Sequence, residues 1–343
     1  MLVRAERTLC SESESHRFMA VADGIIQDIS EDLRPSPGEE VVDFTGYTLS
    51  PCFCDYHLHF PENDSKPPQV IAGMLLRRGI IKAYEGGGRQ GAGFEMKRVL
   101  AGEMTIMSSG YAIYKKGGYG SVIGRGIDKA AQAVAVIHQL NDLGADYIKV
   151  IHSGIFDPAS GSITGGGFEA DELRQIVCLA RERSLDVFCH ANGEKAVREA
   201  VDAGVSAIVH GLQVKRETLS AMAERKVVFI PTLNAFRSLL VLAKGASARL
   251  HIERALEGHL SAVTEAFHKG VTVLPGSDAG PKFIPFGKAY SEELDLFLRA
   301  GIPYNEVIRA ASMGPLKKGM PADFLVLDGL EIKKIVRHGQ ILD

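Results

Sequence analysis

The sequence predicts an α/β fold: a (β/α)8 TIM barrel of eight parallel strands, with a small β domain built from both chain ends. Across the middle of the chain, short apolar runs of strand length alternate with amphipathic segments of helix length, which favours parallel pairing. The 343 residues, of which 45% are hydrophobic, suffice for one barrel-sized core. The expected strands cover residues 48–54, 79–84, 104–109, 146–151, 186–189, 207–209, 227–230 and 271–274.

Amphipathic segments lie between these runs. Residues 129–143 and 171–183, for example, carry apolar side chains at intervals of three and four, as amphipathic helices do.

Both ends of the chain are β-rich. Residues 18–21 and 25–29 are short apolar runs joined at an Asp-Gly turn, and residues 322–343 contain similar runs. Because chain termini commonly lie close together, we expect both ends to pair in one small sheet. The chain is therefore divided into a β domain of residues 1–46 plus 322–343 and a barrel of residues 47–321.

Composition narrows the class of partner. The net charge is −3, and lysine and arginine are dispersed, so we expect a small-molecule substrate and neither nucleic acid nor membrane as a partner. No apolar stretch reaches the roughly 20 residues that span a bilayer, and the N-terminus lacks the apolar core of a secretory signal. We therefore expect a cytoplasmic protein and leave homo-oligomerisation open.

The five cysteines do not form the pattern of a disulfide framework. Cys52 and Cys54 share strand parity with Tyr56 and Leu58, so they should lie on the opposite face from His57 and its partner histidine. We expect these two thiols to be buried and inert.

Six polar residues follow apolar runs or end them, just where a barrel strand would reach its catalytic mouth. They are His57, His59, Lys149, His190, His210 and Asp278. Imidazole and carboxylate groups suit zinc, manganese, iron or cobalt. The pattern therefore predicts a metal-dependent hydrolase.

The chain resembles the amidohydrolase superfamily, and within it the branch of imidazolonepropionase-like enzymes and Xaa-Pro and Xaa-Arg dipeptidases. The resemblance covers nearly the whole chain. It rests on DYHLHF, GADYIKVIHSG, DVFCHANGEKAVREAVDAGVSAIVHG, FIPTLNA, LPGSDAG and GMPADFLVLDG, which occur in the family's order. It implies a metal-binding barrel whose terminal β domain is a small sandwich.

The resemblance also implies roles for the six residues. His57 and His59 would bind the more buried metal ion, and His190 and His210 the other. Lys149, carboxylated by carbon dioxide, would bridge both ions.

Asp278 would contact the buried ion and a bridging hydroxide, taking its proton during attack and returning it to the leaving amine. The cofactors are thus two divalent metal ions, with zinc the first choice and manganese, iron or cobalt the alternatives, plus carbon dioxide. The expected reaction is cleavage of an amide, cyclic amide or peptide-like C–N bond in a small molecule by the metal-bridging hydroxide.

Substrate contacts are expected in loops after the strands. Tyr119 lies in a glycine-rich loop, at a place where the family commonly has a histidine, and Asn234 and Arg237 follow the seventh strand. Arg237 could grip a substrate carboxylate in a bidentate pair. The histidines outside the six are expected to be solvated, except His152, which is expected to pack near the site.

Two alternatives remain open. A mononuclear deaminase would use one metal ion and a glutamate, but Lys149 and Gln213 in HGLQ argue against it. A non-catalytic binding protein with this fold should have lost ligands, whereas all six are present. Two departures from the family, Cys52 in place of glycine and a short linker before residue 322, concern the β domain and the substrate pocket.

Overall fold

A computed structural model describes residues 1–9, 17–62 and 66–342; Cys10 and His16 lie outside the described residues. The chain divides into two compact units. The first comprises Met1–Cys54, Leu75–Ile81 and Pro303–Asp343, and the second comprises Asp55–Met74 and Lys82–Ile302. The bounds expected from the sequence for the two domains stay a prediction.

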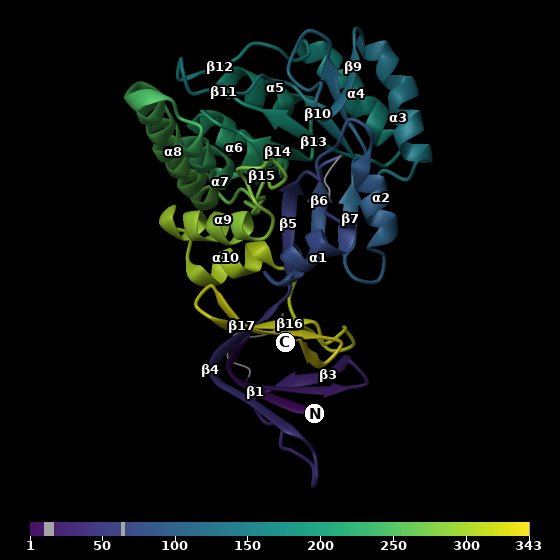
Figure 1. The fold of residues 1–343 in the computed structure, drawn as a ribbon, viewed down its shortest axis with the longest axis vertical. Helices are drawn as coiled ribbons and strands as arrows, with labels where there is room; N and C mark the ends of the chain where they lie inside the picture. The colour runs from purple at the N-terminus through teal and green to yellow at the C-terminus, as the bar shows by residue number, and fades with distance from the viewer. Residues whose placement is uncertain (10–16, 63–65, 343) are drawn as a thin grey trace. The chain divides into compact units, whose positions relative to one another are not determined.

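The first unit contains a seven-stranded sheet in the order β18-β17-β16-β4-β1-β2-β3. Its strands are β1 (Leu2–Thr8), β2 (Phe18–Ala22), β3 (Ile25–Ser30), β4 (Val41–Pro51), β16 (Phe324–Asp328), β17 (Glu331–Arg337) and β18 (Gln340–Leu342). β16 pairs antiparallel with β4, with Phe324 opposite Pro51, so segments from the two chain ends lie side by side (Figure 1). The expected pairing of both ends in one sheet is confirmed.

A two-residue turn joins β2 to β3. Asp23 and Gly24 have φ angles of 51° and 73°, as the tight hairpin turn expected from the sequence requires. The sheet packs on a core that includes Met19, Ile26 and Phe324, each with no exposed surface. The unit also contains helix α10 (Tyr304–Ala311).

Two sheets provide most strands of the second unit. One has the order β5-β6-β7, and the other β15-β14-β13-β10-β8-β9, whose neighbours pair in parallel. The strands are β5 (Phe53–Leu58), β6 (Ile80–Glu85), β7 (Thr105–Ser108), β8 (Ala112–Lys115), β9 (Gly124–Ile127), β10 (Tyr147–Ile151), β13 (Asp186–Ala191), β14 (Ala207–His210) and β15 (Val228–Ile230). A short hairpin, β11 (Phe156–Asp157) with β12 (Ser162–Ile163), lies in the loop after β10.

Helices alternate with these strands (Figure 1). They are α1 (Pro68–Leu76), α2 (Ala92–Val99), α3 (Ala133–Asp142), α4 (Ala170–Arg181), α5 (Glu194–Ala203), α6 (Arg216–Arg225), α7 (Leu233–Ser238), α8 (Gly245–His268) and α9 (Lys288–Arg299). The alternation confirms the α/β class. No helix among the described residues is both long enough and apolar enough to span a membrane.

The last expected strand, residues 271–274, is reduced to an isolated parallel bridge between Val273 and Phe229. A second bridge joins Ala279 to Leu58 on β5. The strand pairing therefore does not establish a closed barrel of eight strands, which stays a prediction.

The first expected strand, residues 48–54, is divided between two strands, β4 and β5. Thr48 to Pro51 pair with β16 and belong to the terminal sheet, and the strand that carries His57 begins only at Phe53. Strands β8 and β9, in the loop after β7, were not expected because their sequence is rich in glycine.

We predict that Phe324→Ala destabilises the protein by about 3–5 kcal/mol, because it leaves a cavity in the core of the terminal sheet. Urea denaturation followed by circular dichroism would measure the loss. The matched control is Leu342→Ala, since this side chain is 42% exposed. Equal midpoints for the two variants would contradict the assigned core.

Candidate metal centre

The six predicted residues line one cavity of about 310 Å³ in the second unit. His57 and His59 come from the end of β5, Lys149 from β10, His190 from β13 and His210 from the last position of β14. Asp278 follows the segment that bridges to β15 and precedes the bridge to β5. The cavity thus brings together residues that lie more than two hundred positions apart in the sequence.

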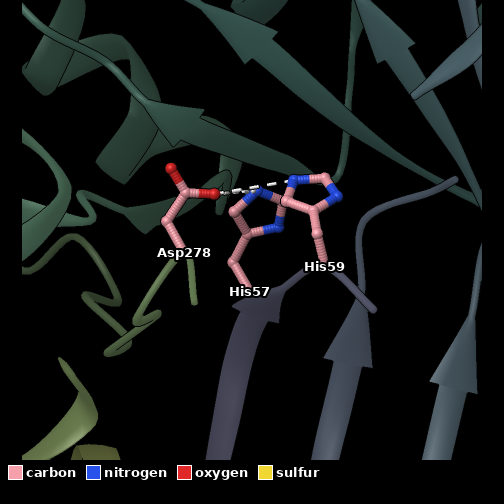
Figure 2. Close-up of side chains that lie close together, drawn as sticks. All are labelled: His57, His59 and Asp278. Atoms are coloured by element: carbon pink, nitrogen blue, oxygen red, sulfur yellow. Dashed lines mark ion pairs between the residues drawn. The ribbon is translucent and has the colours of Figure 1, made fainter. Parts of the chain in front are cut away.

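Three of the six form a cluster with the spacing of a metal site. Nε2 of His57 and Nε2 of His59 lie 3.4 and 3.5 Å from the same carboxylate oxygen, Oδ1 of Asp278 (Figure 2). Ligand atoms of the three side chains all lie within 4.8 Å of one another. The backbone N–H of Asp278 also donates to the His57 carbonyl at 2.7 Å, which fixes the two residues side by side.

Each of three histidines is oriented by a hydrogen bond from one ring nitrogen. Nδ1 of His59 donates to the Gly87 carbonyl at 2.9 Å, and Nε2 of His190 donates to the Gly154 carbonyl at 3.0 Å. Nδ1 of His210 lies 2.7 Å from the Thr232 hydroxyl. The two carbonyl contacts fix the tautomers of His59 and His190 and leave the other ring nitrogen of each free to bind metal.

Burial keeps these imidazoles neutral. It lowers the pKa of His59 to about 4 and that of His190 to about 3, with Lys149 as the next cause. The pKa values of His57 and His210 are also well below the ordinary value, again because of burial first. Neutral rings keep the lone pair that a metal ion requires.

Lys149 is the least satisfied group of the site. Its side chain is 1% exposed, and Nζ has no hydrogen-bond partner among the described residues. Burial lowers its pKa, with Asp278 acting in the opposite direction. A buried amine without a hydrogen-bond partner is unfavourable as a free cation.

Asp55 is a buried residue of the site that the sequence analysis did not single out. Its Oδ1 accepts the N–H groups of His57 at 3.2 Å and Ser277 at 2.9 Å, and its Oδ2 accepts the Ser277 hydroxyl at close range. The side chain is fully buried, which raises its pKa to about 7. Asp55 therefore ties β5 to the segment that carries Asp278. Its spacing of two from His57 is the signal that could have revealed it.

His259 corrects an expectation. Three other histidines, His138, His268 and His338, are exposed as expected, but His259 is 1% exposed on the inner side of α8. Its Nε2 donates to the Pro231 carbonyl at 2.9 Å, and its ring meets that of Phe236 edge-on at 5.0 Å. Burial lowers its pKa to about 4.

His152 is buried, as expected, and pairs with Glu199 at 3.2 Å. The expected burial of Cys52 and Cys54 is confirmed, and burial raises the pKa of the Cys52 thiol to about 12.

Of the three predicted substrate contacts, one lines the cavity and two do not. Tyr119 lines the cavity, with its ring centre 5.4 Å from that of His190, and burial raises its pKa to about 12. Asn234 and Arg237 line neither this cavity nor the one adjoining it. Nε of Arg237 donates to the Asn234 amide oxygen at 3.0 Å, and its guanidinium forms a 2.7 Å ion pair with Glu292.

Comparisons with known proteins agree with the fold. The model of the amidohydrolase family matches residues 48–337. An imidazolonepropionase of Salinispora arenicola is 21% identical over 352 residues, covering 90% of this chain and 84% of that protein. An uncharacterized protein of Mycobacterium bovis is 26% identical over 145 residues, which are 41% of this chain and only 39% of that protein.

Solved structures share the fold over the full chain. A Xaa-Pro dipeptidase with bound methionine superposes with a TM-score of 0.84 at 20% identity, covering 100% of this chain and 99% of that one. An A. niger ochratoxinase superposes with a TM-score of 0.81 at 19% identity, covering 99% and 94%. At these identities the likeness establishes the fold.

We predict that Asp55→Asn weakens metal binding by tenfold to a hundredfold, because the amide cannot accept all three hydrogen bonds that align His57 and Asp278. Competition with a chromophoric chelator would measure the affinity. Asp43→Asn, at a half-exposed position of β4, is the control. Unchanged affinity in Asp55→Asn would show that the carboxylate does not support the site.

Acid should destabilise the metal-free protein through its buried histidines. Between pH 6.5 and pH 4, His259 is protonated in the unfolded chain and neutral in the folded protein. Its contribution to the free energy of unfolding is therefore fully present above pH 6.5 and is lost as the pH falls toward 4. The loss should be about 3 kcal/mol smaller in His259→Gln, which keeps an N–H for Pro231. Urea denaturation at pH 7 and pH 4 measures it. The control is His268→Gln, at an exposed position of the same helix, which should lose as much stability as the wild type. An equal loss in His259→Gln would contradict the assignment of His259 as a buried, neutral histidine.

Proposed function

Since the chain belongs to the amidohydrolase family and is a hydrolase of carbon–nitrogen bonds, we propose that it uses two divalent metal ions to cleave an amide, cyclic amide or peptide-like bond of a small molecule. The observation that carries the proposal is the convergence of four neutral imidazoles, one carboxylate and one buried lysine on a single cavity. Zinc is the first choice of metal, and manganese, iron or cobalt would suit the same ligands.

The donor atoms suggest how two metal ions would be shared. His57, His59 and Asp278 would hold one ion, since their ligand atoms are already clustered. His190 and His210 would hold the other, and their rings meet edge-on at 4.5 Å. Lys149, as a carbamate formed with carbon dioxide, would contribute a bridging anion. This modification removes the cost of burying an unpaired cation and partly compensates the charge of the metals.

The chemistry divides between the metals and the chain. When bound, two divalent ions polarise the scissile carbonyl and supply hydroxide at neutral pH. The carboxylate of Asp278, which lines the cavity, would take a proton and return it to the departing amine. Burial raises the pKa of Asp278 toward the range where such exchange is efficient. The Tyr119 hydroxyl, neutral at pH 7, can donate a hydrogen bond to the substrate.

The same residues weigh against a mononuclear deaminase. Gln213, which stands where that chemistry would need a glutamate, lines a different cavity together with His251 and His259. Lys149 has no role in a site with one metal ion, yet it is buried and lines the same cavity as the predicted ligands.

Lys149→Ala tests the proposal. We expect wild-type protein, purified from cultures supplied with zinc and bicarbonate, to contain about two metal ions per chain and the variant one or none, because the bridging anion is lost. Hydrolysis of a panel of amides should fall by at least a hundredfold and be partly restored by millimolar acetate, which supplies a carboxylate in place of the carbamate. Elemental mass spectrometry measures the metal.

The matched control is Lys116→Ala, a lysine 55% exposed and paired with Asp128 at the surface. It should keep both ions and full activity. One ion in wild type, unchanged in Lys149→Ala, would instead favour the mononuclear site.

A further inference from the structure

The metal-site cavity opens into an apolar lobe of about 180 Å³. The two share Tyr119, His190, His210 and Asp278 in their walls. The rest of the lobe is mostly hydrophobic and is formed chiefly by Ile155, Phe156, Phe236, Leu239, Phe283 and Ile284. A substrate whose scissile bond lies at the metal ligands must therefore place one of its substituents against these side chains.

The lobe has the size of an aromatic ring. A dry cavity of about 150 Å³ lined by leucine, isoleucine and phenylalanine is enough to hold benzene. Phe156, Phe236 and Ile284 are at most 6% exposed and form a fixed wall, because Phe156 and Phe236 also belong to a packed cluster with Ile252. Burying an apolar ring there is favourable by about 25 cal/mol for each Å² removed from water.

The lobe and the cavity lack a cation to receive a substrate anion. Among the described residues that line them, the one cationic side chain is Lys149, which the metal site uses, while Glu62 adds a negative charge. The nearby candidate, Arg237, is committed to Glu292, and Lys282 is exposed and lines neither space. A substrate carboxylate in the lobe would lose its hydration without gaining a partner.

On these grounds, and resting on the proposed function, we propose that the enzyme acts on uncharged substrates that carry an aromatic or bulky apolar group in this lobe, and that it discriminates against the carboxylates of dipeptides and N-acyl amino acids. The neutral polar groups in the walls, the Tyr119 hydroxyl and the Asn192 amide, suit the carbonyl or N–H of such a substrate. Specificity would then come from shape and from the absence of charge.

Two amides that differ only in a carboxylate provide the test. N-acetylphenethylamine and N-acetylphenylalanine are each hydrolysed by adding water across the C–N bond, giving acetate and the free amine. We expect the metal-loaded enzyme to bind the neutral amide at least tenfold more tightly, by calorimetry, and to hydrolyse it with at least tenfold higher kcat/KM. Equal binding, tighter binding of the acid, or binding of neither would overturn the lobe assignment.

Failure of the two proposals can be distinguished. A preference for the neutral amide in binding, without hydrolysis of any amide by protein that holds two metal ions, would contradict the proposed function and leave the lobe in place. Hydrolysis of both amides with a preference for the acid would contradict the lobe assignment and leave the proposed function in place.

A cation placed at the rim should change the preference. Ile155 lines the lobe and is 42% exposed, so Ile155→Arg should fold and should shift the ratio of the two affinities at least tenfold toward the acid. Val241→Arg is the control, since that side chain is 76% exposed and lines neither space. An unchanged ratio in Ile155→Arg would show that the acid does not enter the lobe.

Discussion

The site depends on one buried carboxylate. Asp55 accepts hydrogen bonds from His57 and Ser277, residues that lie 220 positions apart, and so holds the end of β5 against the segment before Asp278. The Asp278 N–H bond to the His57 carbonyl and the bridge from Ala279 to Leu58 extend the same junction. Without this junction, His57 and Asp278 would not be held in a fixed position relative to each other. A metal site needs its donors placed to within a few tenths of an ångström, so this junction determines whether a site exists.

Backbone strain occurs at two of the predicted ligands and at a residue that contacts one of them. His210, Thr232 and Asp278 all have φ angles between 49° and 73°, which non-glycine residues rarely adopt and which is unfavourable by about 1–3 kcal/mol each. The conformation of Thr232 directs its hydroxyl to His210. Buried Glu293 holds the next turn by accepting the N–H groups of Leu233 and Asn234 at 2.9 and 2.6 Å. Packing and hydrogen bonds thus offset the backbone strain at His210 and Thr232, and the strained conformation keeps the His210 imidazole directed at the cavity.

Most of the site could be predicted from the sequence because several of its residues lie at strand ends. An apolar run followed by His or Asp indicates a side chain at the carboxyl end of a parallel strand. His57, His190 and His210 lie at or next to such ends, whereas Lys149 is the middle residue of β10. Supporting groups give weaker signals. His259 lies on a long helix whose charged neighbours suggest exposure, and only tertiary packing buries it. Residues 48–51 form a strand as expected, but periodicity cannot tell which sheet a strand joins.

The charge balance of the cavity explains why the lack of a second cation matters for specificity. A cation in the lobe would form an ion pair with a substrate carboxylate and thereby position the substrate. In this cavity the groups that line the lobe are uncharged apart from the predicted ligands, so a carboxylate placed in the lobe would lose its hydration without gaining a partner. A neutral amide loses less hydration on entering the lobe, and the same arrangement therefore favours it over the acid.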